Sequence, residues 1–129
     1  ESGSQSEIQA LNETKEALGE SIDRIVVKTG NKIQILALSH IDHFEAQDDY
    51  VAIHAEQGKF LKQIRMKHLE ENLPSKEFVR IHRSHIVSVA GIEKLELYEK
   101  DSYLLSLKSG KQLPVSRSGH SKLKEVLKY

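Results

Sequence analysis

Seven histidines are the side chains of this sequence best suited to metal or acid–base chemistry. They include two pairs whose members are three residues apart, His40 with His43 and His82 with His85. That spacing places two ligands on one face of a helix but on opposite faces of a strand, and the surrounding residues favour strands and turns. No cysteine and no HExxH pattern accompanies the histidines. We therefore expect no metal site and no bound cofactor.

The sequence patterns that most often indicate catalysis are missing. There is no GxSxG nucleophile elbow, no phosphate-binding P-loop and no GxGxxG fingerprint. Asp48 and Asp49 are adjacent carboxylates at a predicted loop tip, where a solvated turn is a commoner reason for them than an acid–base pair. The lack of cysteine excludes thiol nucleophiles and disulfides. We expect a protein that is not an enzyme.

Basic side chains at predicted loops and helix starts are more informative. They form three groups: Arg65 and Lys67; Arg83; and Arg117, His120 and Lys122. Arginine can bind phosphate or read guanine O6 and N7 through two hydrogen bonds, so an arginine at a loop tip suits a nucleic-acid groove. Alternatively, these charges keep a small β protein soluble and protect its edge strands. Residue types alone leave both interpretations open.

The central group follows an interrupted strand. Residues 78–82 (FVRIH) alternate apolar and polar side chains, as a strand does. If the strand continued, Arg83 and His85 would be buried on its apolar face, and an unpaired buried arginine is prohibitively costly. We therefore expect the backbone to turn at residues 82–85 before residues 86–89 resume an apolar segment. Such a turn would present Arg83 to a partner from between two buried anchors, unless it is an ordinary solvated turn.

Short strands must position these residues. Strands are predicted over residues 23–28, 33–38, 43–46, 50–55, 59–64, 78–82, 92–98, 102–107 and 112–115. Met66, Leu69 and Leu73 mark one short amphipathic helix that Pro74 ends, and a second helix follows residues 116–119. This pattern predicts an all-β sandwich or barrel of nine or ten short strands, with one short internal helix and a C-terminal helix.

Charge divides the 129-residue chain into two parts. Its net charge is zero, but residues 1–21 hold five glutamates against one lysine, and the remainder has an excess of basic residues. We expect residues 1–21 to be a linker helix, a disordered end or a cloning remnant, and residues 22–129 to be one domain. No apolar run approaches the roughly 18 residues that cross a membrane, so a soluble cytoplasmic protein is expected.

Several motifs, in order, resemble one known family. The run FVRIHRSHIVSVAGI, with KHLEENLP before it and LPVSRSGHSKL after it, is similar to the LytTR DNA-binding domain of the LytR/AlgR family of bacterial response regulators. The upstream segment IDHFEAQDDYVAIH extends the resemblance, which covers roughly residues 23–128. It implies an elongated β-β-β sandwich of three small sheets. It also implies the output domain of a bacterial two-component transcriptional regulator, acting through phosphorelay signal transduction.

The resemblance further implies how DNA is bound. Such domains recognise double-stranded DNA sequences through loops that enter successive major grooves, commonly at paired repeats, and the full-length parent can form a homodimer. Tyr50 matches the first recognition loop, Arg83 with Ser84 the central loop, and Arg117 the third. The residues expected to contact DNA are Tyr50, Arg65, Lys67, Arg83, Ser84, Arg117 and His120.

Asp48 and Asp49 do not fit this expectation easily, because carboxylates are repelled by a phosphate-lined groove. Their loop contributes little, or the acids accept hydrogen bonds from cytosine amino groups, or they cap the loop internally. The alternative function is a β-rich protein-interaction module without nucleic-acid binding. That module would expose an apolar patch in place of convergent basic tips.

Overall fold

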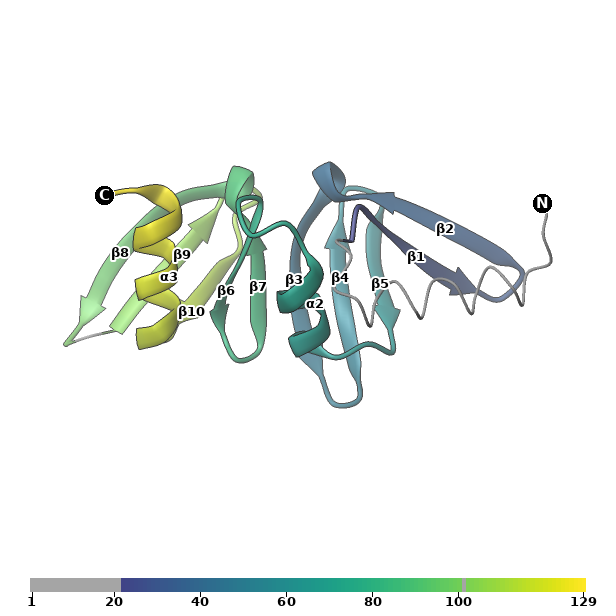
Figure 1. Cartoon of the computed structure of the whole chain (residues 1–129), viewed down its shortest axis with the longest axis horizontal. Helices are drawn as coiled ribbons and strands as arrows, with labels where there is room; N and C mark the ends of the chain where they lie inside the picture. Colours follow the sequence, from purple (N-terminus) through teal and green to yellow (C-terminus); the bar gives the residue numbers. More distant parts are fainter. Residues whose placement is uncertain (1–21, 101) are drawn as a thin grey trace.

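The computed structural model describes residues 22–100 and 102–129 as an elongated, mostly β molecule (Figure 1). In chain order the strands are β1 (Arg24–Thr29), β2 (Lys32–Ala37), β3 (Ile41–Gln47), β4 (Tyr50–Ala55), β5 (Gly58–Lys62), β6 (Phe78–His82), β7 (His85–Ser88), β8 (Ile92–Glu99), β9 (Ser102–Leu107) and β10 (Gln112–Val115). The helices of the described part are α2 (Met66–Asn72), α3 (Arg117–Leu127) and two 3-10 turns, Leu38–His40 and Val89–Gly91. None of these helices is long and apolar enough to cross a membrane.

The fold class predicted from the sequence is confirmed. Four strands begin and end as predicted, namely β4, β6, β9 and β10. Strand β3 is longer than predicted because its backbone pairs with β4 on one side and β7 on the other. Helix α2 buries Met66 and Leu69, as its spacing indicated. The helix predicted within residues 1–21 lies outside the described residues.

The strands form three antiparallel sheets that follow one another along the molecule (Figure 1). The central sheet has five strands in the order β5-β4-β3-β7-β6. The β1–β2 hairpin lies at one end, and the sheet β10-β9-β8 lies at the other. The pairing of β3 with β7 joins two hairpin units that are far apart in the sequence.

Strands β6 and β7 contribute to both apolar cores of the described residues. Phe78 and Ile86 enter the first core, which lies between the β1–β2 hairpin, the central sheet and α2. Val79, Ile81 and Val87 enter the second core, with the third sheet and α3. Because successive strand side chains point to opposite faces, this strand pair is buried on both sides.

Helix α3 begins directly against the backbone of β6. The Ser116 N–H donates to the Ile81 carbonyl at 2.8 Å, and the Ser116 hydroxyl caps the helix by accepting from the Gly119 N–H at 3.0 Å. A Cβ on Gly119 would lie 2.0 Å from the Ile81 oxygen. Only glycine permits this approach, so one residue sets how closely α3 sits on the strand.

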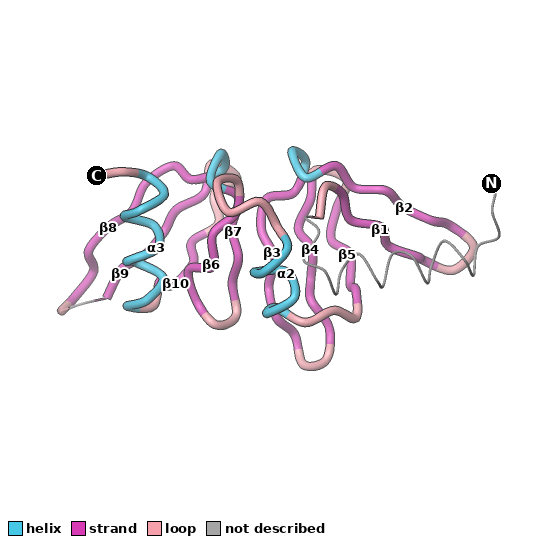
Figure 2. Tube along the Cα trace, viewed as in Figure 1, coloured by secondary structure: helices cyan, strands magenta, loops and turns pink. Residues whose placement is uncertain are grey.

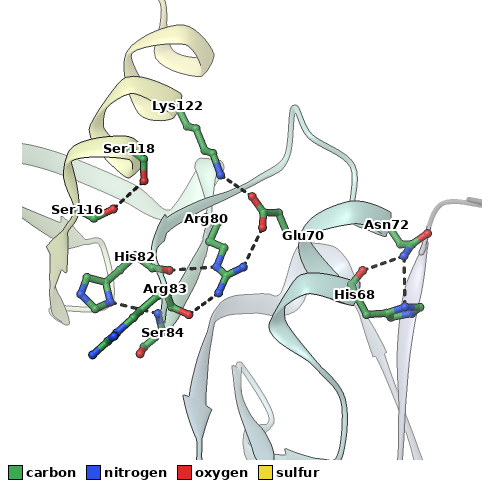
Figure 3. A network of polar contacts seen from close by, with 10 residues as sticks. All are labelled: His68, Glu70, Asn72, Arg80, His82, Arg83, Ser84, Ser116, Ser118 and Lys122. Carbon is green, nitrogen blue, oxygen red and sulfur yellow. Dashed lines mark hydrogen bonds and ion pairs between the residues drawn. The ribbon is translucent and has the colours of Figure 1, made fainter.

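Glu70 connects α2 to both β6 and α3 (Figure 3). Its Oε1 accepts from Arg80 Nη1 at 2.9 Å, and its Oε2 accepts from Lys122 Nζ. The hydrogen bond from Lys122, followed by that from Arg80, holds the pKa of Glu70 below its ordinary value. The Glu70 side chain is 33% exposed, so solvent screens the charges and each pair stabilises the fold only weakly. The shared carboxylate nevertheless ties three elements together.

Replacing Gly119 by alanine is expected to force α3 away from β6. The Gly119→Ala variant should lose about 1–3 kcal/mol of unfolding free energy, as overpacked sites do, measured by urea denaturation. Gly91→Ala is the matched control, because its Cβ would lie at an ordinary 3.4 Å from Asp42 Oδ1. Equal losses in the two variants would contradict the steric explanation.

Acid is expected to weaken the Glu70 link. A carboxyl whose pKa is lowered by folding stabilises the protein above its unfolded pKa, and this stabilisation is lost as pH falls through the folded pKa. Between neutral pH and about pH 3, the parent chain should therefore lose more unfolding free energy than Glu70→Gln. Urea denaturation at both pH values measures the difference, and Glu71→Gln controls for net charge. An equal loss in Glu70→Gln and the parent would show that the link does not stabilise the fold.

Candidate nucleic-acid interface

Arg83 and Ser84 form the tight turn between β6 and β7, and the backbone of this turn is held from three directions. Arg80 Nη2 donates to the Arg83 carbonyl at 2.6 Å, and Arg80 Nε donates to the His82 carbonyl at 3.3 Å (Figure 3). The Ser84 N–H donates to His82 Nδ1 at 3.2 Å. The Ser84 carbonyl accepts from the Ala46 N–H at 2.9 Å. A fixed backbone thus carries the exposed Arg83 side chain, which points away from this network.

The turn expected at residues 82–85 is present, but His85 differs from the expectation. His85 was expected to lie in the turn and to avoid burial. It is instead the first residue of β7, and it is only 9% exposed. Burial lowers the pKa of His85. An imidazole can lose its proton and enter a core as a neutral group, whereas a guanidinium cannot. Only Arg83 and Ser84 therefore need to leave the strands.

Arg80 orders the central turn, a role that the sequence patterns did not predict. It occupies a polar position of β6, and its three acceptors come from α2 and from the turn itself. The available signal was an arginine in a strand three residues before Arg83. Its role became visible only when the positions of Glu70 and the turn carbonyls were known.

The first predicted loop, between β3 and β4, is the dipeptide Asp48–Asp49. Asp48 has φ 53°, a left-handed conformation that aspartate tolerates better than most residues, which gives a backbone reason for its presence. Tyr50 follows and is 46% exposed. Tyr50, both aspartates and Arg65, which precedes α2, line one depression. The structure therefore places Arg65 beside the loop that carries Asp48 and Asp49, where its positive charge can offset theirs.

The third predicted loop is the start of α3. Arg117 is its first helical residue and is exposed. Ser116 and Ser118 line a second depression together with Arg83 and Lys122. The central and third loops therefore border one shared surface.

Two predicted residues stand apart from these depressions. The His120 ring stacks on Tyr103 with centroids 3.8 Å apart and planes 9° apart, and His120 Nε2 lies 2.7 Å from the Tyr129 hydroxyl. These contacts give His120 a packing role between α3 and the third sheet, and its predicted DNA contact stays a prediction. Lys67 is exposed in the first turn of α2.

The segments that carry these residues lie along one edge of the molecule. Figure 2 shows the β3–β4 loop, the loop before α2, the β6–β7 turn and the start of α3 along its lower side. Each segment after the first carries an exposed basic side chain: Arg65 and Lys67, Arg83, and Arg117. A row of cations can bind successive phosphates, and an arginine on a rigid tip can also reach base edges.

Comparison with solved structures supports the same grouping. One match is the LytTr DNA-binding domain of a putative methyl-accepting/DNA response regulator from Bacillus cereus. It superposes with a TM-score of 0.76 at 28% sequence identity, covering 84% of this chain and 100% of that chain.

Curated relatives include longer proteins. The heme-containing CO-sensing transcriptional regulator RcoM 1 of Paraburkholderia xenovorans is 33% identical over 105 residues, which cover 81% of this chain and 39% of the relative. The sensory transduction protein LytT of Bacillus subtilis is 26% identical over 104 residues, covering 81% of this chain and 43% of LytT. The chain thus spans about two fifths of these relatives.

The family model described as the LytTr DNA-binding domain matches residues 31–128, which include all three predicted loops. The resemblance inferred from the sequence motifs is therefore confirmed. This chain belongs to the LytTR family of DNA-binding domains.

Proposed function

We propose that this domain binds double-stranded DNA in a sequence-specific manner through the loop edge shown in Figure 2. The observation that carries the proposal is the exposed Arg83 on a turn whose carbonyls and Ser84 N–H are already hydrogen-bonded within the protein. A guanidinium presented this way loses little conformational freedom when it binds, and it can make the paired hydrogen bonds that distinguish guanine.

The neighbouring loops supply the remaining contacts. Arg117 enters the groove from the start of α3, and Tyr50 packs or makes one polar contact from the first loop. Arg65 and Lys67 contact phosphates beside that loop, where they also offset the charge of the nearby aspartates. The elongated arrangement of the tips suits successive major grooves of one duplex.

The biological role is the output of a bacterial transcriptional regulator. Relatives named as a transcriptional regulator and as sensory transduction proteins support this role. The domain acts in the cytoplasm at paired repeats in promoters. A dimer of the full-length parent would strengthen binding, because the second domain then binds at a high effective concentration.

A protein-interaction surface is the second candidate function. Val26, Ile33 and Ile35 are 42%, 65% and 59% exposed on the β1–β2 hairpin. Val26 pairs with Ile35 across the strands, so these side chains share one face of the hairpin. This apolar face lies on the hairpin at one end of the molecule, apart from the loop edge. A protein partner would therefore bind there without replacing DNA.

Removing the Arg83 side chain is expected to weaken and broaden DNA recognition. Fluorescence anisotropy should show that Arg83→Ala binds an enriched duplex about 5- to 150-fold more weakly, a loss of about 1–3 kcal/mol. Preference at one base position should relax. Binding by the parent chain should fall steeply as salt increases.

Arg24→Ala is the matched control, since Arg24 begins β1 outside the loop edge, pairs with the preceding Asp23, and its replacement also removes one positive charge. A parent chain that binds no duplex at low salt would contradict the DNA proposal. Equal effects of the two substitutions would instead show that Arg83 contributes only its charge.

Arg80 is expected to act on DNA through Arg83. Arg80→Met should weaken binding in the parent background but should add no further loss in Arg83→Ala, because coupled residues are not additive. Amide hydrogen exchange at Ser84 should become faster in Arg80→Met, since the turn loses its clamp. Fully additive losses with unchanged exchange at Ser84 would contradict a positioning role.

A further inference from the structure

Three potential metal ligands meet on β3 and β4. His43 and Glu45 alternate along β3 and so share one face of the sheet, and His54 of β4 is the register partner of His43. One ligand atom from each of the three residues lies within 4.8 Å of the others. His43 and His54 are eleven positions apart, so the hairpin register, and not a helical spacing, brings them together.

One ring nitrogen of His43 has a hydrogen-bond partner, and the other is left to bind a metal. His43 Nδ1 lies 2.9 Å from Asp42 Oδ2. The carboxylate oxygen occupies the Nδ1 side of the ring, so Nε2 is the ring nitrogen left to bind a metal. The side chain is 1% exposed, and Nε2 has no hydrogen-bond partner in the described structure. A buried polar atom left this way costs about 1–3 kcal/mol, which a bound cation would offset.

Two features position the Asp42 side chain beside His43. The pairing of β3 with β4 is irregular between Ile41 and His43, and such bulges redirect side chains. Asp42 Oδ2 also accepts from the Ser109 hydroxyl at 3.0 Å. A carboxylate that holds the second nitrogen of a histidine is the usual outer partner of a metal-binding imidazole.

We propose that His43 Nε2, His54 and Glu45 bind one divalent transition-metal ion of the zinc class. Two imidazoles and one carboxylate form a ligand set that zinc uses, and a fourth position remains for water. Both histidines line a cleft of about 630 Å³ between the central and third sheets.

Binding requires one ring to turn. The two imidazoles are stacked, with centroids 4.1 Å apart and planes 9° apart, so their in-plane lone pairs run parallel. His43 is fixed by burial and by Asp42, whereas His54 is 21% exposed and contacts Glu45 at 3.3 Å. His54 is therefore the ring that rotates to direct a nitrogen at the ion. If the two rings only pack against each other, added zinc should not rotate His54.

Isothermal titration of the tag-free 129-residue chain with zinc chloride tests the proposal. One ion should bind per chain, and His54→Gln and Glu45→Gln should each weaken binding at least about 10-fold. Asp42→Asn should weaken it about 10- to 100-fold without removing a ligand. Nitrogen-15 spectra of the imidazoles should show zinc-dependent shifts at His43 and His54.

His40→Gln is the matched control, because His40 lines the same cleft and is exposed but is absent from the ligand group. It should leave the zinc affinity unchanged. Lack of one-to-one binding by the parent chain would overturn the proposal. So would equal weakening by His40→Gln and His54→Gln. His54 and Glu45 are partly exposed, so their variants stay informative even where His43 variants fail to fold.

Discussion

The constraint on which this structure depends is that β6 and β7 are buried on both faces. One set of their side chains completes the core beneath α2, and the alternate set completes the core beneath α3. In a two-stranded unit buried in this way, a fully exposed charged side chain is most easily placed where the strands end. The Arg83–Ser84 turn is therefore the natural place for a cation. The apolar demands of two cores thus determine where the molecule can contact a charged partner.

The Arg80 network makes that turn a fixed platform. A half-buried guanidinium is tolerated only when its donors are satisfied, and Arg80 meets this condition with the Glu70 carboxylate and two turn carbonyls. Lys122 adds a second cation to Glu70, so the network reaches α3. A movement of α2 or α3 would therefore shift Arg80 and, through it, the backbone of Arg83. The network exerts its effect through geometry more than through stability, since solvent screens its charges.

Local patterns predicted the strands and the turn because alternation and its failure are properties of a few neighbouring residues. For that reason the exposed position of Arg83 was predicted correctly. The position of His85 was not, because a histidine can lose its proton and be buried as a neutral group, whereas an arginine cannot. The role of Arg80 depends on a helix ten residues earlier in the chain. The pairing of His43 with His54 depends on hairpin register and on a bulge. Register and docking are tertiary properties, so motif spacing did not reveal them.

The pairing of β3 with β7 has a consequence for how the chain folds. The β3–β4–β5 and β6–β7 units close short loops, but the pairing of His43 with Val87 closes a much longer loop, at a larger entropic cost. We expect this joining to be a late step. Until then the edge of β7 that faces β3 is unpaired, and an unpaired strand edge favours self-association. The strands that position the Arg83–Ser84 turn therefore also present an open edge while the chain folds.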